Sequence, residues 1–263
     1  MSTLAALTDI ASEPVTQVSS NPVKPNIMFI LDDSGSMDWT HMPDESADPG
    51  STVIFSYGFY GYRSPQCNRV YYNPAFTYNP PVKADGTSYA NASFTAAWTD
   101  GFAGTGSVNL STSFKAGDSM NSGTGDATGS AAYYYKYTGT QTADTQKNYN
   151  DSTTTFYKEC ASLNGVMPGS GVFTKVTVSA TSGPGMTDER QNFANWYSYY
   201  RKRMLTMKSA VGLSFKPIDD RYRVGFTTIN YSGTTTTNSS FQKIDDFGTS
   251  QKSTWYTKLY GAS

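Results

Sequence analysis

The residues best suited to chemistry are a carboxylate and two hydroxyls that follow a short apolar run. In "NIMFILDDSGSM", Asp32, Ser34 and Ser36 stand at a spacing of two, so in a looping backbone their side chains can converge on one point. A carboxylate with two hydroxyls, and no His or Cys, suits Mg²⁺, Ca²⁺ or Mn²⁺ better than Zn²⁺. Gly35 lets the loop turn tightly. The pattern predicts a divalent-cation site, against the alternative of an ordinary Asx or Ser turn.

The element that must position these residues is the run "NIMFIL" at positions 26–31. Its β-branched and aromatic side chains predict a strand that is buried on both faces. In a parallel sheet covered by helices, ligands bind in the crevice beyond the carboxyl ends of the strands. The cation site is therefore expected at the carboxyl end of the first strand.

Enzyme chemistry fits the same residues poorly. A haloacid dehalogenase-type phosphotransferase needs a second acid two residues after the first, and Ser34 stands there. Neither Ser34 nor Ser36 lies in a G-x-S-x-G elbow. The only histidine, His41, is too close in sequence to be their obvious base, and we expect it in a surface loop. The sequence also has no P-loop and no G-x-G-x-x-G after a strand, so it predicts a binding protein and not an enzyme.

Composition excludes some partners and leaves the redox state open. The 263 residues carry 20 Lys plus Arg and 21 Asp plus Glu, which gives no basic footprint for nucleic acid. No stretch approaches the ~20 apolar residues that cross a bilayer. In an oxidising compartment, Cys67 and Cys160 would most simply form a disulfide that stabilises by about 4 kcal/mol. In a cytosolic protein they would be two unrelated buried thiols.

The rest of the chain predicts an α/β protein with a long insertion. Positions 38–186 are rich in Gly, Ser, Thr, Asn and Tyr, with many turn signals, and predict loops and short strands at 130–137 and 172–179. The next segment predicts one long amphipathic helix with Asp188 as its N-cap. Its apolar face holds Phe193, Trp196, Tyr197, Tyr200, Met204, Met207 and Val211.

A second strand at 221–229, a short strand at 241–244 and the first turns of a helix at 253–260 follow the long helix. This order predicts an α/β sheet that is incomplete, because such sheets usually need several more strands.

The segments "KPNIMFILDDSGSMDW", "QCNRVYYNPAFTYNPPV" and "RQNFANWYSYYRKRMLTMKSAV" together resemble the amino-terminal part of the PilY/PilC-type proteins. These are type IV pilus biogenesis factors and tip-associated adhesins of Gram-negative bacteria. Within the first segment, "FILDDSGSM" resembles the first metal-binding loop of a von Willebrand factor A domain. The resemblance implies an incomplete von Willebrand A-like (Rossmann-like) sheet whose long, partly β insertion lies between the first strand and the first helix.

The resemblance divides the chain into four regions. A polar lead-in occupies 1–24, and the first strand and metal loop occupy 25–37. The insertion occupies 38–186, and the truncated continuation of the α/β domain occupies 187–263.

The resemblance also implies roles and partners. Asp32, Ser34 and Ser36 become the first three cation ligands, and an acidic group of a partner completes the metal shell. Export, a disulfide-permissive compartment and association with minor pilins at the pilus tip are implied, with a host or surface ligand as a further partner. The family's remaining ligands, a Thr and an Asp, are expected beyond Ser263, so the chain reads as a fragment that holds its cation weakly.

A structural rival gives the binding role to the insertion, independently of metal. Tyrosines of the insertion would then contact pilins or host molecules, although half-buried strand positions explain them more simply. The candidates are Tyr71, Tyr72, Tyr133, Tyr134 and Tyr135.

Overall fold

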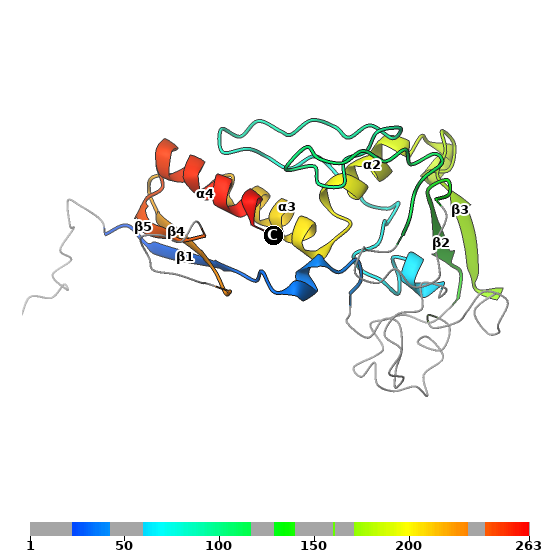
Figure 1. Ribbon diagram of the computed structural model, residues 1–263, viewed down its shortest axis with the longest axis horizontal. Coiled ribbons are helices and arrows are strands. Elements are labelled where there is room, and N and C mark those ends of the chain that lie inside the picture. The colour runs from blue at the N-terminus through cyan, green and yellow to red at the C-terminus, as the bar shows by residue number, and fades with distance from the viewer. Residues whose placement is uncertain are drawn as a thin grey trace, which may run out of the picture.

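The structure is a computed structural model that describes residues 23–42, 60–116, 129–139, 160, 171–230 and 240–262. The predicted polar lead-in lies outside these residues up to position 22. The described fold is mixed α/β, as the sequence predicts, and it contains two separate sheets (Figure 1). Among the described residues, no helix is both long enough and apolar enough to cross a membrane.

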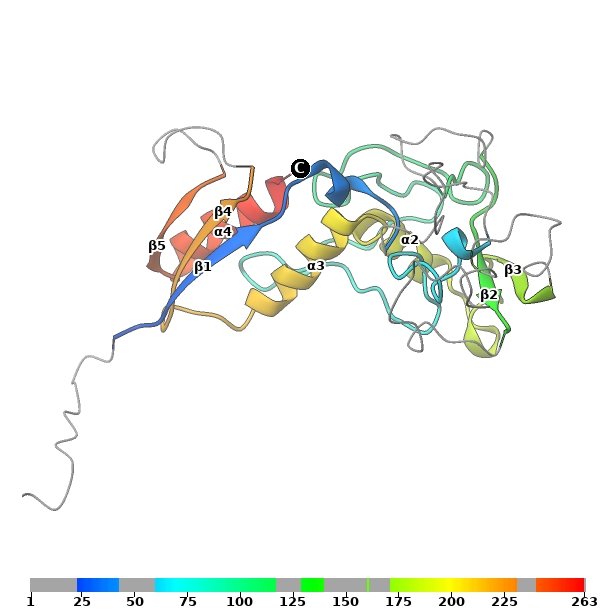
Figure 2. The same ribbon diagram turned by 90° about the horizontal axis from the view of Figure 1, so that it is seen from below.

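The first sheet has three strands in the order β1–β4–β5. Strand β1 (Asn26–Leu31) runs parallel to β4 (Arg223–Thr228), and β4 pairs antiparallel with β5 (Gln242–Asp246). The three predicted strands are thereby confirmed, to within a few residues at their ends. Helices α3 (Arg203–Phe215) and α4 (Thr249–Gly261) lie on one face of this sheet (Figures 1 and 2).

One face of this sheet builds a core against the two helices. Leu31, Val224 and Phe226 of the strands pack with Met204 of α3 and Trp255 of α4, and all five are at least nine-tenths buried. Burial of such side chains stabilises a fold by about 1.5–3 kcal/mol each.

The expectation that β1 is buried on both faces is wrong. Its residues alternate between the two faces: Leu31 is 1% exposed, whereas Met28 and Ile30 are 37% and 57% exposed. The apolar run therefore gave no information on which face the helices cover, because both faces carry apolar side chains.

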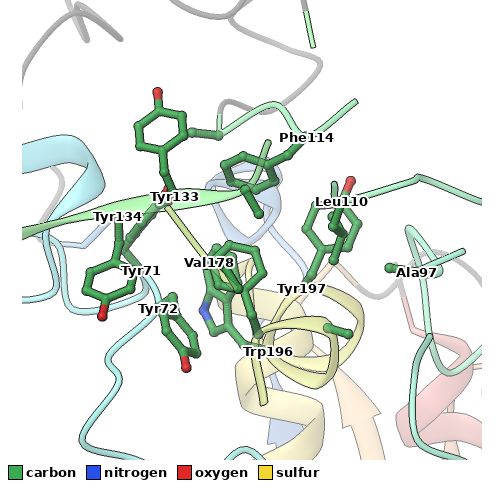
Figure 3. Close-up of a cluster of buried hydrophobic side chains, with 14 of the residues drawn as sticks. Tyr71, Tyr72, Ala97, Leu110, Phe114, Tyr133, Tyr134, Val178, Trp196 and Tyr197 are labelled. Carbon is green, nitrogen blue, oxygen red and sulfur yellow. The ribbon is translucent and has the colours of Figure 1, made fainter. Parts of the chain in front are cut away.

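The insertion builds a second core with helix α2 (Arg190–Tyr199). Its sheet is an antiparallel pair, β2 (Tyr133–Tyr137) and β3 (Phe173–Thr177), which confirms both predicted strands. Figure 3 shows how aromatic side chains from the insertion surround Trp196 of α2. The core residues include Tyr62, Tyr71, Tyr72, Leu110, Phe114, Tyr133, Tyr134, Phe193, Trp196 and Tyr197.

Much of this second core is irregular backbone whose carbonyls are satisfied by aromatic side chains. Tyr71 donates its hydroxyl to the carbonyl of Tyr133 at 2.8 Å, and Trp196 donates its indole N–H to the carbonyl of Val70 at 2.9 Å. Tyr199 donates to the carbonyl of Ala90 at 2.8 Å in the same way. The acceptors at Val70 and Ala90 lie outside the strands, so there the side chains supply donors that a sheet ladder would otherwise supply, whereas Tyr133 is the first residue of β2.

The single long helix predicted after position 188 is wrong, because the chain forms two helices. Helix α2 ends at Tyr199, residues 200–202 leave helical geometry, and α3 begins at Arg203. The predicted apolar stripe is correspondingly divided. Phe193 packs in the insertion core, whereas Met204 packs under the sheet.

Contacts from outside the local sequence stabilise this break. The Ser209 hydroxyl donates to the Tyr199 carbonyl at 2.7 Å, so the end of α2 is satisfied by a side chain of α3. The backbone N–H of Arg203 donates to the Trp39 carbonyl at 3.0 Å, which gives α3 a partner for one of its first amides.

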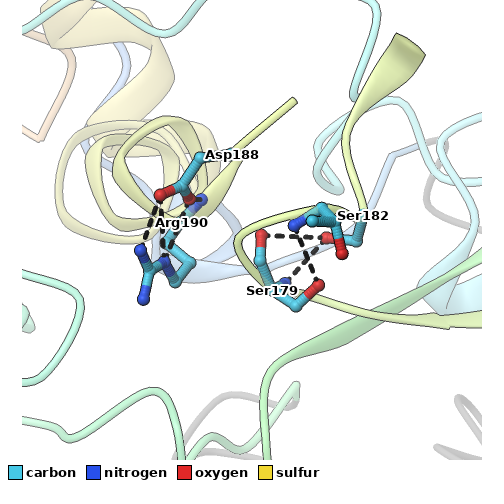
Figure 4. Close-up of polar contacts among 5 residues, drawn as sticks. Ser179, Ser182, Asp188 and Arg190 are labelled. Atoms are coloured by element: carbon cyan, nitrogen blue, oxygen red, sulfur yellow. Dashed lines mark hydrogen bonds and ion pairs between the residues drawn. The ribbon is translucent and has the colours of Figure 1, made fainter. Parts of the chain in front are cut away.

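The predicted N-cap is also displaced. Glu189 occupies the N-cap position, and Asp188 instead accepts the backbone N–H of Arg190 at 3.0 Å and pairs with its guanidinium at 2.6 Å (Figure 4). Gln191 does not complete a capping box, because its amide donates to the carbonyl of Ala92 at 2.7 Å.

Cys67 and Cys160 form a disulfide, 93 residues apart in sequence, with their Cα atoms 5.9 Å apart. Both cysteines are buried in one cluster with Tyr60 and Phe173, so the bond lies beside the first residue of β3. The pairing that an oxidising compartment would allow is thus present, and the alternative of two unrelated thiols is wrong.

Candidate metal centre

The loop after β1 lies at the edge of the sheet where two parallel strands end together. Leu31, the last residue of β1, is paired in register with Thr228, the last residue of β4. Asp32 and the serines after it therefore leave the sheet at its carboxyl edge, where ligand crevices form in open α/β sheets.

The predicted trio is held together by hydrogen bonds. The backbone N–H of Ser34 donates to Asp32 Oδ1 at 2.9 Å. The hydroxyl oxygens of Ser34 and Ser36 lie 3.1 Å apart, within hydrogen-bond distance. The bonds link Asp32 to Ser34, as in the Asx turn that was the alternative, and Ser34 to Ser36, in a tight turn that continues into the 3₁₀ turn Gly35–Asp38.

The charge on this turn is negative. The side chain and the backbone N–H of Ser34 both lower the pKa of the Asp32 carboxyl, so Asp32 carries its charge at neutral pH. One carboxylate and two hydroxyls are a donor set that fits a hard divalent cation. Among the described residues, no group of three His, Cys, Asp or Glu side chains forms a metal cluster elsewhere.

The second carboxylate of the Asp-Asp pair anchors the loop to the next strand. Asp33 Oδ1 accepts the backbone N–H of Asn230 at 2.9 Å, and the Asn230 amide donates to the Asp33 carbonyl at 3.0 Å. Asn230 follows β4, so the two loops at this edge are tied together. Sequence reasoning missed this role; the available signal was a polar residue after each of two parallel strands.

The chain after the turn is fixed to the start of α3. Lys202 forms an ion pair with Asp38, and Arg203 donates from Nε to the carbonyl of His41 at 2.7 Å. The Arg203 guanidinium lies 4.9 Å from the centre of the Trp39 ring, a cation–π distance. The loop is therefore held by β4 on one side and by α3 on the other.

The expectation that His41 lies in a surface loop is wrong. Its side chain is 1% exposed and stacks on Trp39 with ring centres 4.9 Å apart. Its environment is the aromatic packing of this segment, which sequence spacing does not show.

The tyrosines proposed as an alternative binding surface are mostly interior. Tyr71, Tyr72, Tyr133 and Tyr134 are between 0% and 6% exposed, and Tyr135 is half-buried against Tyr60. The explanation as packed residues is confirmed for the first four, so they cannot form a contact surface.

Comparison with known proteins places this architecture in a family. Over 244 residues, 88% of the chain, it is 30% identical to the type IV pilus biogenesis factor PilY1 of Pseudomonas aeruginosa strain PAK. Over 226 residues it is 30% identical to the protein of the same name from strain UCBPP-PA14. The chain belongs to the PilY1-like family.

The similarity to the PilY1-like family covers most of this chain but little of its relatives. The chain spans 18% of the strain PAK protein and 16% of the strain UCBPP-PA14 protein. No protein-family model matches the chain, and no solved structure matches it.

Proposed function

We propose that this chain acts in type IV pilus biogenesis and that its first α/β unit is a von Willebrand A-like, metal-dependent binding module. Membership of the PilY1-like family supports the first part. The hydrogen-bonded turn of Asp32, Ser34 and Ser36 at the carboxyl edge of parallel strands supports the second, and it is the observation that carries the proposal.

In this proposal, Asp32, Ser34 and Ser36 hold the divalent cation (Mg²⁺, Ca²⁺ or Mn²⁺). A bound cation would supply a positive centre that attracts an acidic group of a partner. Asp33 orients the turn through Asn230 and is not itself a ligand. Because three oxygens are fewer than the six or more that Mg²⁺ and Ca²⁺ prefer, binding by this chain alone is weak.

The proposed partners are minor pilins at the pilus tip and, for adhesion, a host or surface ligand with an acidic group. The proposed location is outside the cytoplasm, at the pilus tip and associated with the outer membrane. The Cys67–Cys160 disulfide supports export, because such bonds persist in oxidising compartments. The proposed role is binding, without an enzymatic reaction.

The experiment is a Mn²⁺ titration of the purified chain, followed by electron paramagnetic resonance of the free ion. Asp32→Ala is expected to abolish the binding, and Ser34→Ala and Ser36→Ala to weaken it. Asp85→Ala is the matched control, since Asp85 also accepts a backbone N–H two residues ahead, from Thr87 at 2.9 Å, but has no neighbouring serine pair.

Equal Mn²⁺ binding by the Asp32→Ala and Asp85→Ala variants would remove the metal site from the proposal. The biogenesis role is tested separately by the number of surface pili in cells whose full-length protein carries Asp32→Ala. Partner binding that survives both EDTA and this substitution would favour a metal-independent surface elsewhere in the chain.

A further inference from the structure

A groove of about 430 Å³ lies away from the metal loop, over the first turns of α2. Its walls come from residues 72–79, from Asn91 and from the segment that enters the helix at 184–195. The volume falls in the range of about 300–1,000 Å³ that is typical of small-molecule sites.

The floor of the groove is a rigid polar network. Glu189 is 3% exposed, and its Oε2 accepts the Tyr72 hydroxyl at 3.1 Å. Asn195 is 4% exposed; its Oδ1 accepts the backbone N–H of Ala92 at 3.0 Å and its Nδ2 donates to Asn91 Oδ1 at 2.9 Å. Satisfied buried networks of this kind hold their members in one arrangement.

Two exposed amides at the edge of this network, those of Asn91 and Gln191, each keep one unpaired polar atom in the described part of the chain. Asn91 Oδ1 accepts from Asn195, and Gln191 Nε2 donates to the Ala92 carbonyl. In the described part of the chain, Asn91 Nδ2 and Gln191 Oε1 then have no protein partner, although the rest of each amide is fixed. They are a positioned donor and a positioned acceptor.

An exposed aromatic side chain belongs to the same lining. Phe76 is 65% exposed, which is unusual in a chain whose other aromatic side chains are mostly interior. Its backbone is held, because the Asn192 amide donates to the Phe76 carbonyl at 2.7 Å. The ring is therefore an exposed apolar group on an anchored backbone, in the lining that also holds Asn91 and Gln191.

Two acids and no basic residue line the groove. Its exposed acid, Asp188, is paired with Arg190 (Figure 4), and Glu189 is buried and hydrogen-bonded. No lysine lines it, and none of its lining residues belongs to a strand. An anionic ligand would lack a free cation to bind, and an extended peptide would lack a strand edge to pair with.

We propose that this groove binds a neutral saccharide. The apolar C–H face of a sugar ring stacks on Phe76, while its hydroxyls accept from Asn91 Nδ2 and donate to Gln191 Oε1. Saccharides present both features within one ring, which matches the mixed lining of this site. The site is independent of the cation loop.

The test is binding of the purified chain to an array of neutral oligosaccharides, built from hexoses, deoxyhexoses and N-acetylhexosamines, with and without EDTA. Phe76→Ala is expected to weaken binding about tenfold, the equivalent of one aromatic contact. Asn91→Asp keeps an acceptor for Asn195 but removes the free donor and adds a negative charge, so a loss of at least about tenfold is expected there too. Leu213→Ala, at a 43% exposed apolar side chain on α3, is the control and binds like the wild type.

Several outcomes would overturn the proposal: no neutral saccharide on the array is bound, or Phe76→Ala and Asn91→Asp bind as tightly as the control. Loss of binding in EDTA would assign the activity to the metal loop instead. Circular dichroism of each variant verifies that the fold is intact, and the two variants act through different atoms.

Discussion

Removal of the Cys67–Cys160 disulfide tests how much this bond contributes to the free energy of unfolding. The bond closes a loop of 93 residues, for which the chain-entropy treatment gives about 4.7 kcal/mol. The structure argues for a smaller loss. Tyr71, Tyr72 and Leu110 lie inside that loop and are buried in the second core, so they restrain it without the bond.

The packing around Cys160 also affects the expected loss of stability. A Cβ placed on Gly61 would lie 2.5 Å from the Cys160 carbonyl oxygen, so the backbone of Cys160 is in direct contact with that turn. Without the disulfide, nothing covalent holds the Cys160 backbone against Gly61. We therefore expect the variant Cys67→Ala/Cys160→Ala to lose about 2–4 kcal/mol of its free energy of unfolding. For a chain of this size, that is roughly 4–16 °C in Tm.

The assay is urea denaturation of the wild type and the double variant, each with and without dithiothreitol. Dithiothreitol should lower the midpoint of the wild type to that of the variant, and should leave the variant unchanged. An oxidised wild type that unfolds at the same urea concentration as the variant would refute the reasoning. Equal sensitivity of both proteins to dithiothreitol would show that the reductant acts elsewhere.

Three further predictions concern the packing of the two cores. Ser209→Ala leaves the buried Tyr199 carbonyl without its donor and should cost about 1–3 kcal/mol in urea denaturation; an unchanged midpoint would contradict it. Gly101→Ala places a Cβ 2.3 Å from the buried Tyr199 ring and should cost about 1–3 kcal/mol, seen as a lower Tm; a Tm equal to the wild type would show that the ring can move. Burial raises the pKa of Tyr78 and of Tyr256 to about 12. Because the folded state keeps these protons while the unfolded chain releases them near pH 10, stability is intact below pH 10 and falls between pH 10 and 12, by roughly 1.4 kcal/mol per pKa unit and group. Urea midpoints that are equal at pH 9 and pH 11.5 would exclude this linkage.

The strands of the first sheet were predictable because their signal is local. The runs at 26–31 and 221–229 are apolar and β-branched, and each forms a strand within two residues of the expected bounds. Which side of β1 the helices cover was not predictable, because Met28 and Ile30 are as apolar as Phe29 and Leu31.

The break between α2 and α3 could not be predicted for a different reason. The apolar spacing of three and four continues from Tyr200 to Met204, so periodicity shows one helix. The break depends on the Trp39 carbonyl, which is more than 160 residues away in the sequence, and on Ser209, whose hydroxyl replaces a helical amide. Tertiary contacts of this kind are invisible to local spacing.

The candidate site likewise has one part that local sequence predicts and one part that depends on distant residues. The grouping of Asp32, Ser34 and Ser36 is a local property of a turn, and the geometry agrees with it, while cation binding there stays a prediction. The different task of Asp33 requires Asn230, 197 residues later, and the only signal for it is that each residue follows one of two predicted strands.

The tyrosine hydroxyls of the second core have a consequence for how this insertion can vary. Buried irregular backbone tolerates few side chains, because each must fill space and also donate a proton to a particular carbonyl. A change from Tyr to Phe preserves shape yet leaves a buried acceptor without its donor, so an ordinarily conservative exchange becomes a costly one at Tyr71. The aromatic richness of the chain is thus the means by which the described part of the insertion, with its two short strands, acquires an interior.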